Sequence, residues 1–150
     1  MKTKLAAALI TTCISASAMA AEGVVNIAAS KSVAETADNL EKVFASKGMT
    51  IFNRIKHSES AKEVGIELRD TEVIIFGNPK IGSQLMKCQQ SVAIDLPQKA
   101  LVWEDEDSNV WITYNDPAYL VDRHSIEGCD EVVNTVSNAL SNLTNAAAKM

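Results

Sequence analysis

Residues 72–88 read EVIIFGNPKIGSQLMKC, and this stretch decides the fold because it joins a strand to a helix. The run Glu72–Phe76 is nearly all apolar, which predicts a strand with a central position in a sheet. Asn78 followed by Pro79 is the pattern of a helix N-cap and a first helical residue. The helix that begins there carries an apolar face. That face comprises Ile81, Leu85 and Cys88.

The rest of the chain also consists of segments with a strand pattern and segments with a helix pattern. Helix periodicity runs from a capping box at Ser32 to Gly48, and again from about Ser125 to the end. Residues 61–68 fit a short helix or a turn. The predicted order β-α-β-β-α-β-β-α favours an α+β two-layer sandwich, a mostly antiparallel sheet with helices on one face. The other predicted strands are Val24–Ala28, Ile51–His57, Ala100–Glu104 and Val110–Tyr114.

The first twenty residues have the pattern of a bacterial export signal. Lys2 and Lys4 precede an apolar stretch, and the small residues Ala18 and Ala20 suit a signal peptidase. We expect cleavage after Ala20, a signal peptide over residues 1–20 and a single domain over residues 21–150, located in the periplasm or secreted. The alternative is a membrane anchor, but the apolar core is short for a bilayer of about 30 Å.

Charge and hydropathy narrow the classes of partner. Cleavage would remove two of the 14 basic residues and leave 12 against 19 acidic ones. Nucleic-acid binding needs clustered cations that release counterions, so this acidic balance argues against a nucleic-acid partner and against docking on anionic lipid. No segment beyond the leader is long and apolar enough to predict insertion into a membrane.

Two cysteines, Cys88 and Cys129, remain in the expected mature chain. Their spacing does not fit a CxxC redox or zinc motif, and an oxidising compartment favours a disulfide between them. Both lie on the apolar stripes of predicted helices, so helices lying side by side on the sheet would bring them together. The alternative is two separate buried thiols.

Five short segments occur in the order typical of one bacterial family: Arg54–His57, Gly65–Leu68, Phe76–Lys80, Asp95–Pro97 and Tyr114–Pro117. The sequence resembles the family called domain of unknown function 302, and the resemblance implies a β-α-β(4)-α sandwich related to the TATA-binding-protein-like fold, together with a homodimer. The family carries no established activity, so the resemblance implies no mechanism.

His57 and His124 are the only histidines, which excludes a His-rich metal site. Either one could act as a base or a metal ligand together with a carboxylate such as Asp116. The alternative is that the two histidines have no functional role and simply stand at a strand end and a helix start. At Gly77–Lys80, the free N–H groups of a helix start and the charge of Lys80 would suit an anion, and the alternative is a plain corner between strand and helix.

The sequence contains no nucleophile–base signature, so no catalytic residue, metal ligand or cofactor is assigned. The favoured hypothesis is an exported binding or interaction module without catalysis, whose ligand or protein partner the sequence does not identify. Its site would be a groove between hairpin and helix. Two alternatives are a small periplasmic enzyme with a His–carboxylate pair and a metal or haem carrier. The candidate ligand-binding residues are His57, Asn78, Lys80, Tyr114, Asp116 and His124.

Overall fold

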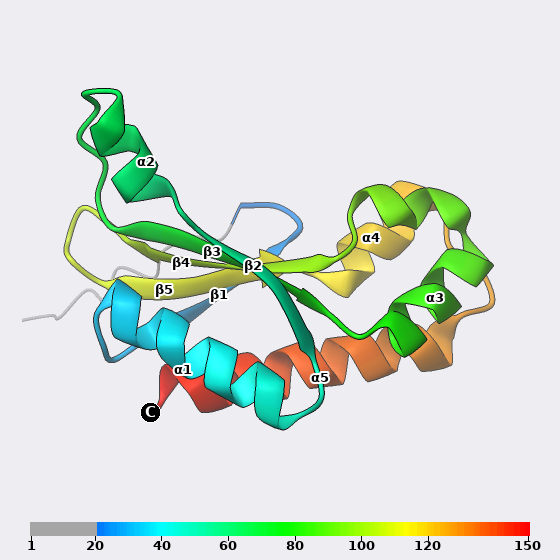
Figure 1. The fold of residues 1–150 in the computed structure, drawn as a ribbon. Helices are drawn as coiled ribbons and strands as arrows, with labels where there is room; N and C mark the ends of the chain where they lie inside the picture. Colours follow the sequence, from blue (N-terminus) through cyan, green and yellow to red (C-terminus); the bar gives the residue numbers. More distant parts are fainter. Residues whose placement is uncertain (1–20) are drawn as a thin grey trace, which may run out of the picture.

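The structure, a computed structural model, describes residues 21–150, and the predicted signal peptide lies outside them. Within these residues, five strands form one antiparallel sheet in the order β1-β5-β4-β3-β2 (Figure 1). The predicted α+β fold is therefore confirmed. The strand that opens the deciding stretch, β3, is paired on both sides, and β4 takes the middle position. The strands are β1 (Val24–Ala29), β2 (Thr50–Lys56), β3 (Thr71–Gly77), β4 (Gln98–Glu104) and β5 (Val110–Asn115).

The two longest helices, α1 (Val33–Ser46) and α5 (Asp130–Ala148), lie side by side against one face of the sheet (Figure 1). Helix α3 (Pro79–Cys88) follows β3 and packs near α5 and the 3-10 helix η1 (Gln90–Ile94). Two shorter helices are α2 (His57–Glu63), which projects beyond the sheet, and α4 (Pro117–His124). No helix within residues 21–150 is long and apolar enough to cross a membrane.

The core lies between the sheet and these helices. Phe44 of α1 and Phe76 of β3 stack with ring centroids 3.9 Å apart and an interplanar angle of 17°. Along β3, buried and half-buried residues alternate, because successive side chains of a strand point to opposite faces. Leu40, Ile74 and Ile112 are fully buried in the same core cluster as the aromatic pair. Burial of each large apolar side chain contributes roughly 1.5–3 kcal/mol to stability.

The C-terminal segment differs from the prediction of one helix from about Ser125. Two helices are present, and the chain turns between them because Ser125 (φ 49°) and Gly128 (φ 68°) adopt left-handed conformations. The first of them, α4, begins at Pro117 with Asp116 as its N-cap. This repeats the Asn78–Pro79 signal that begins α3.

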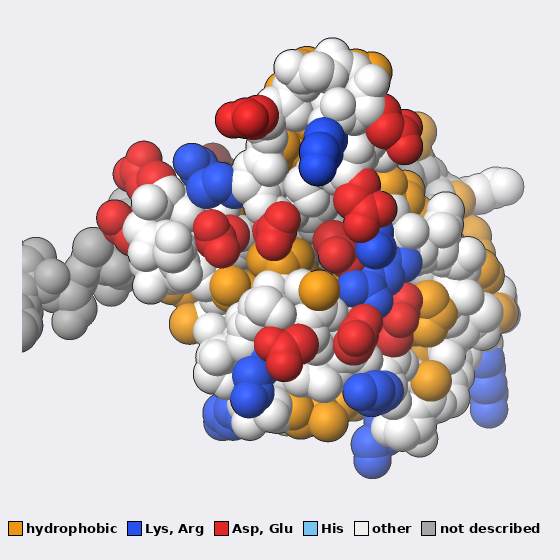
Figure 2. All heavy atoms as spheres, turned by 60° about the vertical axis from the view of Figure 1, so that its left-hand side comes forward, with side chains coloured by type: hydrophobic (Ala, Val, Ile, Leu, Met, Phe, Trp, Pro, Cys, Tyr) orange, Lys and Arg blue, Asp and Glu red, His pale blue; other side chains and the backbone are white. Residues whose placement is uncertain are grey.

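A cluster of charged side chains ties β2 to α1 and β3. Arg54 donates from Nη1 to Asp38 Oδ1 at 2.6 Å and from Nε to the buried carboxylate of Glu72 at 2.5 Å. Burial alone would lower the pKa of Arg54, but the hydrogen bonds to these two carboxylates outweigh it and raise the pKa. Figure 2 shows one face of the molecule, where acidic side chains are spread widely and basic side chains lie among them.

Candidate functional site

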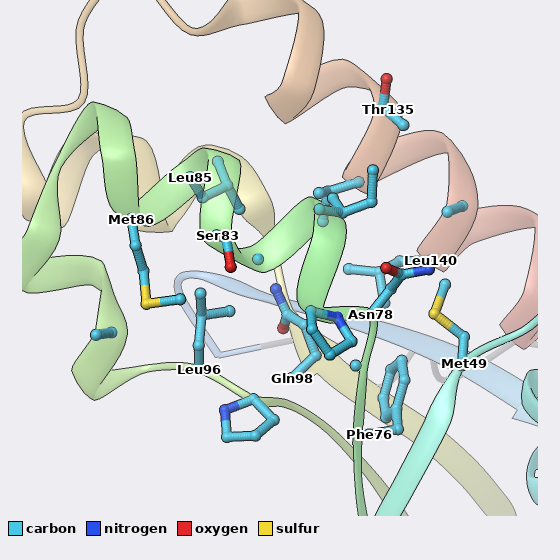
Figure 3. Close-up of a pocket in the computed structure, with 18 of the residues that line it drawn as sticks. Met49, Phe76, Asn78, Ser83, Leu85, Met86, Leu96, Gln98, Thr135 and Leu140 are labelled. Carbon is cyan, nitrogen blue, oxygen red and sulfur yellow. The ribbon is translucent and has the colours of Figure 1, made fainter.

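A cavity of about 320 Å³ opens at the end of the sheet where β3 leads into α3 (Figure 3). Its walls come from four parts of the chain: the start of β2, the β3–α3 corner with the first turns of α3, the segment leading into β4, and the middle of α5. Exposed residues such as Phe52 and Pro97 lie at its rim. The lining is predominantly apolar. It includes Met49, Phe76, Ile81, Leu85, Leu96 and Leu140.

The β3–α3 corner forms one wall because local chemistry fixes its course. Phe76 is held at the end of β3 by its stack on Phe44. Asn78 then caps α3, its Oδ1 accepting a hydrogen bond from the Lys80 backbone N–H at 3.0 Å. Pro79 suits the first helical position because it lacks the N–H group that would have no helical partner there. The predicted helix start at Asn78 is thus confirmed.

A disulfide joins the two helices that flank the cavity. Cys88 is the last residue of α3, and Cys129 is the residue immediately before α5. Their Cα atoms lie 6.4 Å apart. The predicted pairing is present, and the alternative of two separate thiols is not the arrangement observed. The bond fixes one end of α3 against the start of α5.

One polar side chain in the cavity wall lacks a hydrogen-bond partner. Gln98, the first residue of β4, is 7% exposed, and its Nε2 atom is buried without a partner in the structure. Nine in ten or more buried polar groups in proteins are paired, and leaving one unpaired costs about 1–3 kcal/mol. Because Nε2 has almost no accessible surface, this unpaired donor lies behind the cavity surface and not in contact with the open space.

Three of the candidate residues from the sequence lie near helix starts, but only one of them lines the cavity. Asn78 lines the cavity. Lys80 is exposed on α3 and is not among the lining residues. Asp116 is occupied as the N-cap of α4, accepting the Ala118 backbone N–H at 2.9 Å.

The other candidates do not gather around Asn78. His57 is the exposed first residue of α2, and Tyr114 is buried on the inner face of β5; neither lines the cavity. Burial raises the pKa of Tyr114, and a hydrogen bond with Thr144 partly opposes the effect. The structure therefore does not bring His57 and Tyr114 together with Asn78 in one groove.

His124 does meet a carboxylate, although not Asp116. Its Nε2 lies 2.6 Å from Asp95 Oδ2, and its Nδ1 lies 2.9 Å from Ser91 Oγ. A hydroxyl, an imidazole and a carboxylate in a row are the elements of nucleophilic catalysis. None of the three residues lines the 320 Å³ cavity. In the fold, these contacts join the end of α4 to η1 and the segment after it.

The next question is whether the described part of the chain contains a candidate metal site. Across residues 21–150, no three or more His, Cys, Asp or Glu side chains are grouped so that they could hold a metal ion. The sulfur atoms of Cys88 and Cys129 are bonded to each other.

The residue that sequence reasoning missed is Gln98. The strand was expected to start at Ala100, so Gln98 was left outside it, whereas β4 begins at Gln98. A signal was present nevertheless, because Gln98, Ala100 and Val102 are spaced two apart and share one face of the strand. A polar residue in a row of inward-facing apolar positions indicates a buried polar group.

The fold and the cavity define a small α+β protein with helices on one face of an antiparallel sheet and a pocket between helices at its end. Residues 25–143 match the family described as "Domain of unknown function DUF302", and the chain belongs to this family. A similar solved structure is the crystal structure of an uncharacterized conserved DUF302 protein from Bacillus stearothermophilus. It has a TM-score of 0.77 and 18% identity, and the match covers 85% of this chain and 99% of that one. At this identity the similarity concerns the fold alone.

Two curated relatives are named as fluoride-specific ion channels. The chain is 46% identical over 104 residues to "Fluoride-specific ion channel FluC 1" of Brucella suis, a match covering 69% of this chain and 41% of that protein. The protein of the same name from Brucella abortus is equally similar, with 38% of its length covered. The chain thus spans about two fifths of the length of these relatives.

Proposed function

We propose that the protein binds a small, largely apolar molecule in the cavity between α3, α5 and the end of the sheet. The observation that carries this proposal is a cavity of about 320 Å³ with a predominantly apolar lining that comes from four parts of the chain. Ligand sites have volumes of roughly 300–1,000 Å³, with mostly hydrophobic linings and a few polar groups that orient the ligand. The size of this cavity suits a ligand at the small end of that range.

Substitutions at Gly82 provide the test, because this residue lines the cavity. A Cβ atom at Gly82 would lie 3.8 Å from Leu96 Cδ1, with no closer contact. Gly82→Ala should therefore fit, and should stabilise α3 by about 0.5–1 kcal/mol. Gly82→Phe should extend into the cavity and weaken binding of the small fluorophore 1-aminoanthracene by about tenfold or more, an effect of about 1.4 kcal/mol.

Fluorescence titration measures both variants beside the wild type, and Gly82→Ala is the matched control that should bind within about twofold of it. Thermal unfolding checks that each variant is folded. The proposal fails if wild-type protein does not bind the fluorophore, or if Gly82→Phe binds it as tightly as Gly82→Ala does.

We also propose that the protein works outside the cytoplasm after removal of residues 1–20. A disulfide is compatible with an oxidising compartment, where such bonds persist. N-terminal sequencing of protein recovered from the periplasm should give Ala21 as the first residue, and a thiol reagent should label neither Cys88 nor Cys129 without prior reduction. Retention of Met1 in that material would contradict the proposal.

Two copies of the chain are proposed to associate into a homodimer. In support, the segment after α2 presents three large apolar side chains, Val64, Ile66 and Leu68, that are 72%, 59% and 49% exposed. Clustered exposed apolar groups are typical of surfaces that a partner covers. Sedimentation velocity of the mature chain should give twice the mass of one chain, and Ile66→Lys should shift it toward the monomer. Ile94→Lys, at an exposed isoleucine in η1, is the control; a single-chain mass for wild type would rule the dimer out.

A further inference from the structure

The rim of the cavity holds an aromatic side chain that has no pairing partner in the sheet. Ile51 and Asn53 of β2 pair with consecutive residues of β3, so Phe52 between them is an extra residue, a β-bulge. Bulges are frequent next to binding sites, where they re-aim a side chain. Phe52 is 52% exposed and lines the cavity, so its ring has free surface to offer to an occupant.

The ring of Phe52 lies beside the end of β3. A Cβ atom at Gly77 would lie 3.6 Å from Phe52 Cε2 and 3.7 Å from Pro97 Cβ. The phenyl ring and the proline ring are therefore on the same side of Gly77. Since Phe52 and Pro97 are both exposed residues of the lining, they border one part of the cavity mouth.

Two methionines supply contacts deeper in the lining. Met49, which immediately precedes β2, and Met86 of α3 both line the cavity and are only partly buried. Figure 3 shows them on opposite sides of the group of lining side chains. A thioether sulfur makes favourable contacts with aromatic rings and adapts to the shape of what it touches. An aromatic occupant would thus meet a phenyl ring at the rim and sulfur on two sides.

The charge and the size of the occupant are also limited. Among the described residues that line the cavity, none is an Asp, Glu, Lys, Arg or His. A charged ligand would have no partner of opposite charge there, and an unpaired charge in an apolar space is costly. An engineered cavity of about 150 Å³ binds benzene, so a cavity of about 320 Å³ has room for about two fused rings.

We infer that the ligand of this cavity is an uncharged aromatic molecule of about two fused rings, and that Phe52 selects it over a saturated molecule of the same size. The inference rests on the proposed function, because it concerns the same cavity. Hydrophobic burial alone would not make this selection, because a saturated molecule of equal size buries as much apolar surface. The preference comes from the ring contact with Phe52 and from the sulfur contacts of Met49 and Met86.

The test compares 2-naphthol with decahydro-2-naphthol, which share a fused-ring frame and a hydroxyl group and differ in aromaticity. Each displaces 1-aminoanthracene from the wild type, from Phe52→Leu and from Phe52→Tyr. The wild type should bind 2-naphthol about tenfold more tightly than its saturated analogue. Phe52→Leu should reduce this ratio by about threefold or more and keep the affinity for the saturated ligand within about twofold. Phe52→Tyr is the matched control, because it keeps a ring at the rim and should keep the preference.

The possible failures are distinguishable. If the fluorophore and both ligands fail to bind, the proposed function itself is wrong. If the wild type binds both ligands equally, or prefers the saturated one, the cavity binds apolar molecules but the inferred ligand class is wrong. An unchanged ratio in Phe52→Leu would overturn the role of Phe52. Because Phe52 is half exposed, Phe52→Leu should fold, and the wild-type comparison decides the ligand class even if it does not.

Discussion

Replacing both Cys88 and Cys129 with serine is expected to lower the free energy of unfolding by about 4 kcal/mol. The bond closes a loop with a sequence separation of 41 residues, and the chain-entropy model assigns a loss of about this size to such a loop. Since a domain of this kind has a total stability of about 5–15 kcal/mol, the variant should be marginal. Urea unfolding followed by the fluorescence of Trp103 and Trp111 measures the change.

The same bond holds α3 to α5, so its loss should also affect the cavity. Ligand affinity should fall in the double variant even under conditions where it remains folded, because the wall formed by α3 is no longer fixed at Cys88. Wild-type protein treated with a reductant is the control, and it should reproduce both effects without a change in sequence. A decrease of less than about 1 kcal/mol in the free energy of unfolding would show that the disulfide does not stabilise the protein as the chain-entropy model states.

The fold was predictable because its local signals agree with one another. The capped helix start at Asn78, the apolar run of β3 and the glycine that ends α1 each indicate element boundaries that agree with the structure to within one or two residues. The disulfide was predictable for a different reason: two cysteines, an expected oxidising compartment and apolar helix faces left one pairing. Neither inference needed a long-range contact to be known.

The details that sequence reasoning missed depend on tertiary context. Asp116–Pro117 carries the same helix-start signal as Asn78–Pro79, but this pair of residues also fits a turn. The apolar spacing beyond Ser125 suggested one continuous helix and so concealed the break between α4 and α5. The contact between His124 and Asp95 joins residues 29 positions apart, and no local pattern predicts it. The cavity is even harder to predict from the sequence, because its walls come from separate elements that meet only in the folded chain.

Replacing Arg54 with methionine is expected to lower the free energy of unfolding by about 3 kcal/mol or more. Arg54 is the cation that pairs with the buried carboxylate of Glu72, and its side chain is itself only 17% exposed. Removing one partner of a buried ion pair leaves an uncompensated charge, which costs about 3–5 kcal/mol. The variant also loses the link from β2 to Asp38 of α1. Urea unfolding again measures the change.

The matched control is the double variant Arg54→Met/Glu72→Leu, which removes both charges from the same place. Replacing a buried ion pair by apolar side chains of similar size is often neutral or stabilising, so the double variant should recover most of the stability that the single variant loses. This recovery separates the cost of the stranded carboxylate from the loss of packing by the arginine stem. A double variant as unstable as Arg54→Met would show that Arg54 acts through its packing and through Asp38 rather than through Glu72.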